Sequence, residues 1–205
     1  WGVGDGNIPG RGTRCGVARK TAGIRVEALA GRTAVVTGAS RGIGAEIAQE
    51  LAGQGVRVVL VARTEKTLKE RAAHIKGSIP VACDVTDVKS VEQATKRIVA
   101  ELKGAPDILV NNAGIFSVAV AEETVAETFI ATISTNLFEP FLFVRAFLCE
   151  MKKRKSGHII TIGSLADRTA YSGNAAYSAA KFGLRGLHEV LRAELRGTGV
   201  RNTLV

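Results

Sequence analysis

Short apolar runs alternate with longer amphipathic stretches along the chain from Thr33 onward. The runs are rich in β-branched residues and bounded by turn residues, which is typical of strands buried in a parallel sheet. They lie at residues 34–38, 56–62, 80–85, 107–114 and 157–164, and a further run begins at 199. The stretches between them repeat at the 3.6-residue period of helices, at 45–54, 67–75, 91–104, within 120–153, and at 176–197.

Repeated alternation of strand and helix predicts an α/β fold, a doubly wound parallel sheet of the Rossmann type with helices on both faces and right-handed crossovers. We expect residues 29–205 to form one such domain, since the chain is long enough for a single core. Residues 1–28 lack a clear period, a signal-peptide core and a starting methionine, so we expect a disordered or non-native extension. Because the last run stops at Val205, we expect the domain to be incomplete at its C-terminus, with its last strand or strands missing.

The net charge of +9 is compatible with an anionic ligand or a nucleic acid. Part of this excess lies in residues 1–30, and the basic cluster at 152–155 lacks the interleaved aromatics of a single-strand binder. We therefore read that cluster as a solvated helix end and expect no nucleic-acid partner. The apolar stretch 141–151 is broken by Arg145 and Glu150, so we expect no membrane span.

Cysteine and histidine usage bears on compartment and on metal binding. Three widely spaced cysteines without a CxxC pair favour a reducing compartment over a disulfide framework, and we expect a cytoplasmic protein. The three histidines form no HExxH pair and show no other metal-binding spacing, so we expect no metal site.

The glycine-rich stretch TGASRGIG (37–44) lies between the first predicted strand and the first predicted helix. Its spacing is GxxxGxG, where the common dinucleotide fingerprint is GxGxxG. In this place Gly38 permits a tight turn, Gly42 lets the backbone approach a pyrophosphate, and Gly44 lets helix and strand pack closely. A helix N-terminus facing the same point favours an anion, so the loop predicts a dinucleotide site over a purely structural turn.

The residue that ends the second strand distinguishes NAD from NADP. An acidic side chain about 20 positions after the glycines would bind the 2′-hydroxyl of NAD, but Ala62 and Arg63 stand there. Arg63, together with Arg41 inside the loop, can bind a 2′-phosphate through charge-assisted hydrogen bonds. NADP(H) is therefore predicted over NAD(H), the alternative being that Arg63 is a solvated residue at a helix start.

Six motifs in order, TGASRGIG, CDVTD (83–87), NNAG (111–114), TNL (135–137), IGS (162–164) and YSAAK (177–181), resemble the short-chain dehydrogenase/reductase family. The resemblance covers roughly residues 29–205 and is closest to NADP-dependent members similar to 3-oxoacyl-carrier-protein reductases. It implies a dinucleotide-binding and catalytic domain, a small-molecule carbonyl or alcohol substrate, and assembly into a homodimer or homotetramer through the long helices near 120–153.

The resemblance also implies site residues. Asp84 and Val85 are similar to the adenine contacts, although Asp84 could instead cap a turn. The NNAG segment is similar to the one that passes beside the adenosine ribose and also stabilises the sheet. The cofactor-binding residues expected from the loop and from the resemblance are Gly38, Ser40, Arg41, Gly42, Ile43, Gly44, Arg63, Asp84, Val85, Asn112, Ala113, Gly114, Tyr177 and Lys181.

Asn136, Ser164, Tyr177 and Lys181 are similar to the catalytic residues of the family. Tyr177 and Lys181 are four positions apart, so on a helix they share a face. A free phenol titrates near pH 10, and a neighbouring ammonium favours its ionised form, which suits Tyr177 to general acid or base work. The resemblance implies that Lys181 also binds the nicotinamide ribose and that Ser164 orients the substrate oxygen. Asn136 would help to hold a water next to the lysine, although its position alone favours a helix cap.

These expectations combine into an NADP(H)-dependent oxidoreductase that transfers a hydride between nicotinamide and a carbonyl or secondary alcohol. The alternatives are a cofactor-binding member without catalysis and an inactive truncated member. A serine hydrolase is disfavoured, because Leu165 and Ala166 follow Ser164 and no GxSxG elbow is formed.

Overall fold

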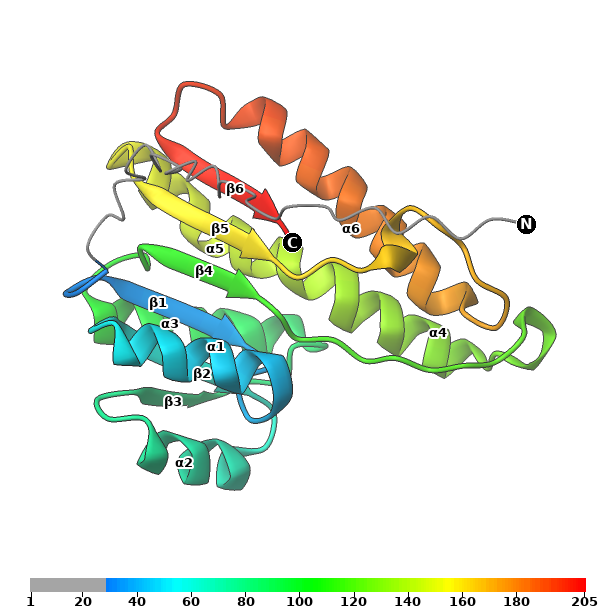
Figure 1. Ribbon diagram of the computed structural model, residues 1–205, viewed down its shortest axis with the longest axis horizontal. Coiled ribbons are helices and arrows are strands. Elements are labelled where there is room, and N and C mark those ends of the chain that lie inside the picture. Colours follow the sequence, from blue (N-terminus) through cyan, green and yellow to red (C-terminus); the bar gives the residue numbers. More distant parts are fainter. Residues whose placement is uncertain (1–28) are drawn as a thin grey trace, which may run out of the picture.

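A computed structural model describes residues 29–205, and the expected extension at 1–28 lies outside the described residues. Six parallel strands form one sheet in the order β3-β2-β1-β4-β5-β6, in agreement with the predicted doubly wound fold (Figure 1). The strands are β1 (Thr33–Thr37), β2 (Arg57–Ala62), β3 (Ile79–Ala82), β4 (Ile108–Asn111), β5 (Gly157–Thr161) and β6 (Val200–Leu204). The order changes direction between β1 and β4, which is the point where open α/β sheets bind their ligands.

The helices connect successive strands. They are α1 (Gly42–Gly53), α2 (Glu65–His74), α3 (Val88–Leu102), α4 (Ala126–Ile133), α5 (Glu139–Lys153) and α6 (Ala175–Glu194), with short 3-10 turns η1 (Ala121–Glu123) and η3 (Leu165–Asp167). No helix among residues 29–205 is long and apolar enough to span a membrane.

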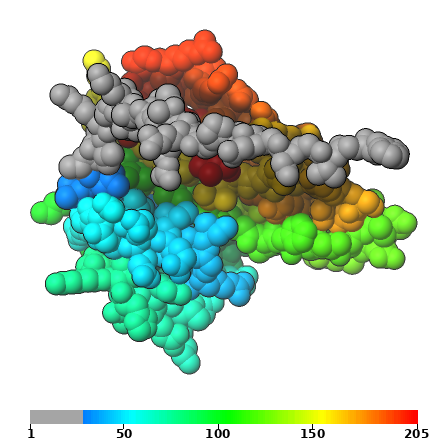
Figure 2. Space-filling view, in the orientation of Figure 1, coloured from blue at the N-terminus to red at the C-terminus, as the bar shows by residue number. Residues whose placement is uncertain are grey.

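Two apolar cores cover the two faces of the sheet. On one face, Ala34, Val36 and Leu60 pack with the apolar sides of α1 and α2. On the other face, Val35, Val59 and their neighbours pack with α3, α5 and α6. Alternate residues of one strand thus enter opposite cores, which explains why each strand reads as a continuous apolar run. In space-filling view, α1 and α2 form the near surface over β1 to β3 (Figure 2).

Several strand ends fall earlier than predicted. β3 ends at Ala82, β4 at Asn111 and β5 at Thr161. Ser164 therefore does not end the fifth strand, as predicted, but lies three residues beyond it as the N-cap of η3. The predictions ran long because glycines and small polar residues continue each apolar run into the loop at the carboxyl edge. The predicted end of the second strand at Ala62 is confirmed.

The predicted helical stretch within 120–153 contains a wider turn. Helices α4 and α5 are continuous through a π-helical segment, η2 (Ser134–Phe138), and extend well beyond the sheet (Figure 1). Asn136 lies inside this segment, so the reading of Asn136 as a helix cap is wrong. Single π turns in long helices are frequent at functional sites, since they change the direction of a side chain without ending the helix.

Candidate active site

A cleft of about 590 Å³ opens at the carboxyl ends of β1, β2, β3 and β4. Eleven of the predicted cofactor-binding residues line it: Gly38, Ser40, Arg41, Gly42, Ile43, Arg63, Asp84, Val85, Asn112, Ala113 and Gly114. Gly44, Tyr177 and Lys181 do not line this cleft. The side chains of Thr64, Thr67, Cys83, Thr86, Ile115 and Thr135 also line it, and sequence reasoning missed them. Threonines after a strand gave no signal, because they are equally common in solvated loops.

The glycine loop is shaped by close contacts as well as by backbone angles. Gly38 has φ +65°, in the left-handed region that favours glycine. A Cβ atom on Gly44 would lie 2.6 Å from the Gly38 carbonyl oxygen and 2.3 Å from Asn112 Nδ2. Gly44 therefore allows the start of α1 to lie directly against the glycine turn and the Asn112 amide. The close approach at Gly44 is to this turn and this amide, and not to the strand as predicted. The backbone at Gly42 faces open space.

Thr37, the last residue of β1, joins the glycine loop to the NNAG segment. Its Oγ1 accepts hydrogen bonds from the backbone N–H groups of Asn112 and Ala113, each at 3.0 Å. Asn112 Nδ2 donates in return to the Thr37 carbonyl oxygen at 2.9 Å. These bonds fix two walls of the cleft against each other, so the threonine that begins TGASRGIG has a positioning role.

Charged groups of both signs line the cleft. Arg41 and Arg63 are exposed, and their side chains form no salt bridge or hydrogen bond to any residue of 29–205. Asp84 Oδ1 accepts from the backbone N–H and the hydroxyl of Thr86, at 3.0 and 2.7 Å. These bonds, with a smaller contribution from the Arg63 charge, lower the pKa of Asp84. Asp84 thus caps a turn, as one reading expected, while its carboxylate stays ionised at the cleft.

Tyr177 and Lys181 lie on one face of α6, as their spacing predicted. Lys181 Nζ lies 5.6 Å from the centroid of the Tyr177 ring and donates to the Ile162 carbonyl oxygen at 2.8 Å. The Lys181 side chain is buried, with 6% of its surface exposed. Burial lowers the pKa of Lys181 to about 8, against the raising effect of the Asp167 and Glu139 carboxylates. The ammonium is therefore held in a fixed place and loses its proton in a mildly alkaline range.

Asn136 reaches the same region from the π segment. Its Nδ2 donates to the carbonyl oxygens of Ile115 and Thr132, each at 2.9 Å. The neighbouring Phe116 ring meets the Tyr177 ring edge-on, with centroids 4.9 Å apart at 88°. Asn136 Oδ1 is buried and has no hydrogen-bond partner among the described residues. A buried amide oxygen of this kind remains available as an acceptor.

Ser164 lies two residues after Ile162, the residue that anchors Lys181. Its Oγ accepts from the Ala166 backbone N–H at 3.1 Å. A hydroxyl that accepts one bond still has its hydrogen to donate. Contacts thus place Lys181 beside Tyr177, and Phe116, which follows the Ile115 that Asn136 bonds, against the Tyr177 ring. Ser164 lies in the loop whose Ile162 carbonyl holds Lys181.

Glu139, the first residue of α5, was not predicted as a site residue. It is completely buried, and burial raises its pKa to about 8, while Thr37 and Lys181 act to lower it. The available signal was an acidic residue inside the apolar run LFEPFLF. A carboxyl with apolar neighbours on both sides of the sequence indicates either a helix terminus or a buried acid.

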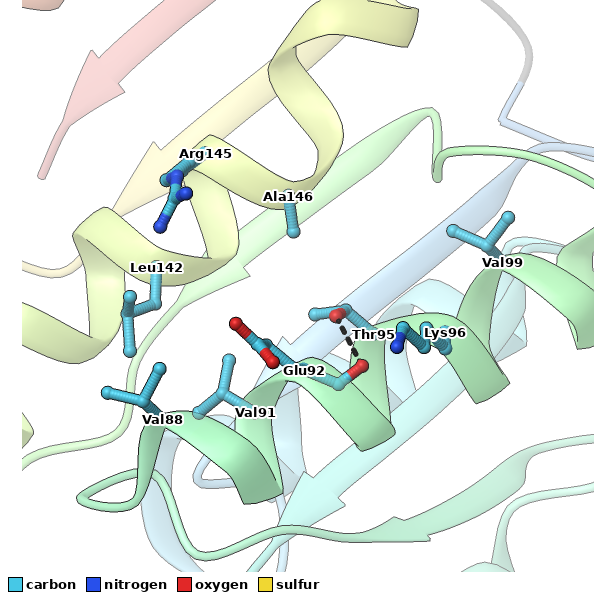
Figure 3. A pocket seen from close by; sticks show the side chains of 9 residues that line it. All are labelled: Val88, Val91, Glu92, Thr95, Lys96, Val99, Leu142, Arg145 and Ala146. Carbon is cyan, nitrogen blue, oxygen red and sulfur yellow. Dashed lines mark hydrogen bonds between the residues drawn. The ribbon is translucent and has the colours of Figure 1, made fainter.

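A second groove of about 580 Å³ lies between α3 and α5, away from the predicted site residues (Figure 3). Its apolar side chains include Val88, Val91 and Leu142, and Glu92, Lys96 and Arg145 add charges. Within the described part of the chain, no group of three or more histidine, cysteine, aspartate or glutamate side chains could hold a metal ion.

Comparisons with known proteins agree with the observed fold. The model of the short chain dehydrogenase family matches residues 32–205. The chain is 39% identical to D-threitol dehydrogenase of Mycolicibacterium smegmatis, over 86% of this chain and 69% of the relative. It is 38% identical to 3-oxoacyl-(acyl-carrier-protein) reductase of Escherichia coli, over 85% of this chain and 72% of the relative. A metagenomic short-chain oxidoreductase, solved in complex with NADP, is 39% identical with a TM-score of 0.80, over 86% of this chain and 81% of that one.

Proposed function

The chain belongs to the short chain dehydrogenase family and is an oxidoreductase, and we propose that it transfers a hydride between NADP(H) and a carbonyl or secondary alcohol, with Tyr177 as the general acid or base. The observation that carries the proposal is the pair of Tyr177 and buried Lys181, which is held by the Ile162 carbonyl just after β5. A lysine without a specific partner would be expected to lie exposed on the surface, whereas Lys181 is buried beside the Tyr177 ring.

The cleft fits a dinucleotide. Its glycine turn, its open backbone at Gly42 and the N-terminus of α1 match the needs of a pyrophosphate, because they offer N–H groups and a favourable dipole. Asp84 and Val85 lie in the same cleft, as an adenine site requires. When bound, the nicotinamide would supply or accept the hydride.

The protein residues would supply position and a proton. In carbonyl reduction, the Tyr177 hydroxyl would donate its proton to the oxygen of the substrate, and in alcohol oxidation its phenolate would accept one. The Lys181 ammonium would stabilise that phenolate, and the two hydrogens of Nζ not donated to Ile162 are free for a ribose hydroxyl. The Ser164 hydroxyl would donate to the substrate oxygen, and Asn136 Oδ1 would accept from a water beside Lys181.

The preference for NADP(H) over NAD(H) rests on Arg41 and Arg63. Both guanidinium groups lie at the cleft without a salt bridge to any described residue, so both are available for a 2′-phosphate. Titrations with NADPH and with NADH, followed by nicotinamide emission, test this preference. Tighter binding of NADPH supports it, and equal or weaker binding of NADPH contradicts it.

We also propose that the protein assembles into a homodimer or homotetramer through its long helices. Phe138 and Phe141 are about 40% exposed and stack at 6.2 Å, and Phe182 is exposed on α6. Exposed aromatic side chains on neighbouring helices are typical of buried interfaces. Light scattering after size exclusion would show a dimer or larger, and a monomer at micromolar concentration would contradict the proposal.

The catalytic proposal is tested with a panel of small carbonyl compounds and NADPH deuterated at the transferring carbon. Transfer of deuterium to the carbonyl carbon, together with NADPH consumption, is the expected result. Tight NADPH binding without transfer to any compound would favour the alternative, a member that binds the cofactor without catalysis.

A further inference from the structure

The loop that follows β5 carries Ser164 and is bonded to α6 on both sides of that residue. Before Ser164, the Ile162 carbonyl oxygen accepts from Lys181 Nζ at 2.8 Å. After Ser164, Asp167 Oδ1 accepts from Arg185 Nη1 at 3.4 Å. Lys181 and Arg185 are four positions apart, so they lie one turn from each other on the same face of α6. Two successive turns of one helix thus hold the two ends of a short segment that has Ser164 inside it.

The Asp167 carboxylate is buried, whereas the two arginines that bind it are partly exposed. The Asp167 side chain is 5% exposed, and those of Arg185 and Arg168 are 37% and 70% exposed. Asp167 Oδ2 lies 3.0 Å from the position that a Cβ atom on Gly163 would take, so it is packed against the backbone just before Ser164. Arg168 is a chain neighbour of Asp167, at 3.2 Å, but Arg185 comes from α6. The bond from Arg185 therefore joins η3 to that helix, and burial of the carboxylate shields it from screening by salt.

Short backbone bonds connect Asp167 to Ser164. The Asp167 N–H donates to the Ser164 carbonyl oxygen at 3.0 Å, and the Ala166 N–H donates to Ser164 Oγ at 3.1 Å. These bonds close the single turn η3, of which Ser164 is the N-cap. Because the turn and the hydroxyl are bonded to each other, a shift of η3 along α6 would move the Ser164 hydroxyl as well.

We propose that Asp167 and Arg185 are positioning residues for the reaction, and that their ion pair holds the Ser164 hydroxyl in place relative to Tyr177. Residues 177, 181 and 185 follow one another along α6 in steps of four. The proposed proton donor and both attachments of the Ser164 loop thus belong to one helix, which fixes their spacing. The inference rests on the proposed roles of Ser164 and Tyr177, since Asp167 and Arg185 act through Ser164.

The first test measures Arg185→Gln in two backgrounds of the full chain, one with Ser164 and one with Ser164→Ala. Arg185 is the partner to change, because burial lowers the pKa of Lys181 and the Asp167 charge counteracts that effect, so a change of Asp167 would act on two groups. With Ser164 present, Arg185→Gln should lower kcat/KM for carbonyl reduction about tenfold, mainly through kcat, since misplacing one group can cost up to about a hundredfold. In the Ser164→Ala background the same change should lower kcat/KM by less than about twofold, because residues that act through one group are not additive. NADPH affinity should be the same in all four proteins.

Arg192→Gln is the matched control, since Arg192 lies two turns further along α6 and pairs with the exposed Glu189 at 3.2 Å. It should leave kcat/KM unchanged in both backgrounds. Arg185→Lys keeps a cation beside Asp167 and should recover part of the lost rate. An unchanged rate in Arg185→Gln would overturn the inference. An equal loss with and without the Ser164 hydroxyl would also overturn it, because the pair would then only stabilise the fold.

Amide hydrogen exchange tests the same ion pair without cofactor or turnover. The N–H groups of Ala166 and Asp167 should exchange about tenfold faster in Arg185→Gln, and at the unchanged rate in Arg192→Gln. Unchanged exchange across 162–168 in Arg185→Gln would contradict the inference even if the enzyme turns over. If the unchanged protein reduces no carbonyl, the proposed function fails, while the exchange still decides whether the pair holds the Ser164 loop.

Discussion

Replacing Gly44 by alanine tests how the cofactor cleft is built. The added Cβ would lie 2.6 Å from the Gly38 carbonyl oxygen and 2.3 Å from Asn112 Nδ2, far inside van der Waals contact. The Asn112 amide would have to move, and with it the 2.9 Å bond to the Thr37 carbonyl oxygen. Overpacking typically costs about 1–3 kcal/mol and a lost hydrogen bond about 1 kcal/mol, so we expect a loss of about 2–4 kcal/mol in the free energy of unfolding.

Gly53→Ala is the matched control at the other end of α1, where an added Cβ meets nothing within 4 Å and φ is not positive. Alanine in a helix should leave stability unchanged or raise it by up to about 1 kcal/mol. Urea unfolding measures both effects, and NADPH titration measures the cleft. Gly44→Ala should also weaken NADPH binding. If Gly44→Ala is as stable as Gly53→Ala and binds NADPH equally well, the close-approach account of the glycine loop is wrong.

Three further predictions concern charge and substrate. The pKa of Glu139 in the folded protein is raised from 4.5 to about 8. The contribution of its protonated form to the free energy of unfolding is therefore fully present below about pH 4.5 and is lost as pH rises through about 8. Glu139→Gln should therefore gain stability over the unchanged protein across that window, by an amount on the order of 5 kcal/mol in urea unfolding at its upper end, and a pH-independent difference would refute this. Arg63→Ala should weaken NADPH binding about tenfold or more with little effect on NADH, while Arg71→Ala on α2 outside the cleft should change neither. Phe116→Ala should raise KM for apolar carbonyls about five- to tenfold through loss of its edge contact with Tyr177, and an unchanged KM would exclude Phe116 from the substrate site.

The fold was predictable because its signals are local and repeated. Each strand was marked by β-branched residues that enter two cores, and the starts of the predicted strands fall within one residue of the observed ones. Strand ends were less predictable, as Ser164 shows. The loop residues at the carboxyl edge are a mixture of glycines, small polar and apolar residues, so the sequence pattern does not stop where the hydrogen-bonded ladder stops.

The site was predictable where chemistry sets the spacing. The four-residue spacing of Tyr177 and Lys181 has a direct geometric meaning on a helix. The π turn around Asn136 has no such signal, because a single wider turn leaves the apolar pattern of the helix almost intact. The hydrogen bonds of Thr37 and the raised pKa of the buried Glu139 depend on residues more than 40 positions away in sequence, so they follow from the tertiary structure alone.

The most direct test of the central claim compares Tyr177→Phe with the unchanged protein at saturating NADPH and carbonyl substrate. The structure offers a matched control, since the other tyrosine, Tyr171, is exposed on a loop before α6. The account predicts that Tyr177→Phe loses turnover by about two orders of magnitude or more while its NADPH affinity is retained, and that Tyr171→Phe retains both. Normal turnover in Tyr177→Phe would contradict Tyr177 as the proton donor, and with it the proposed mechanism.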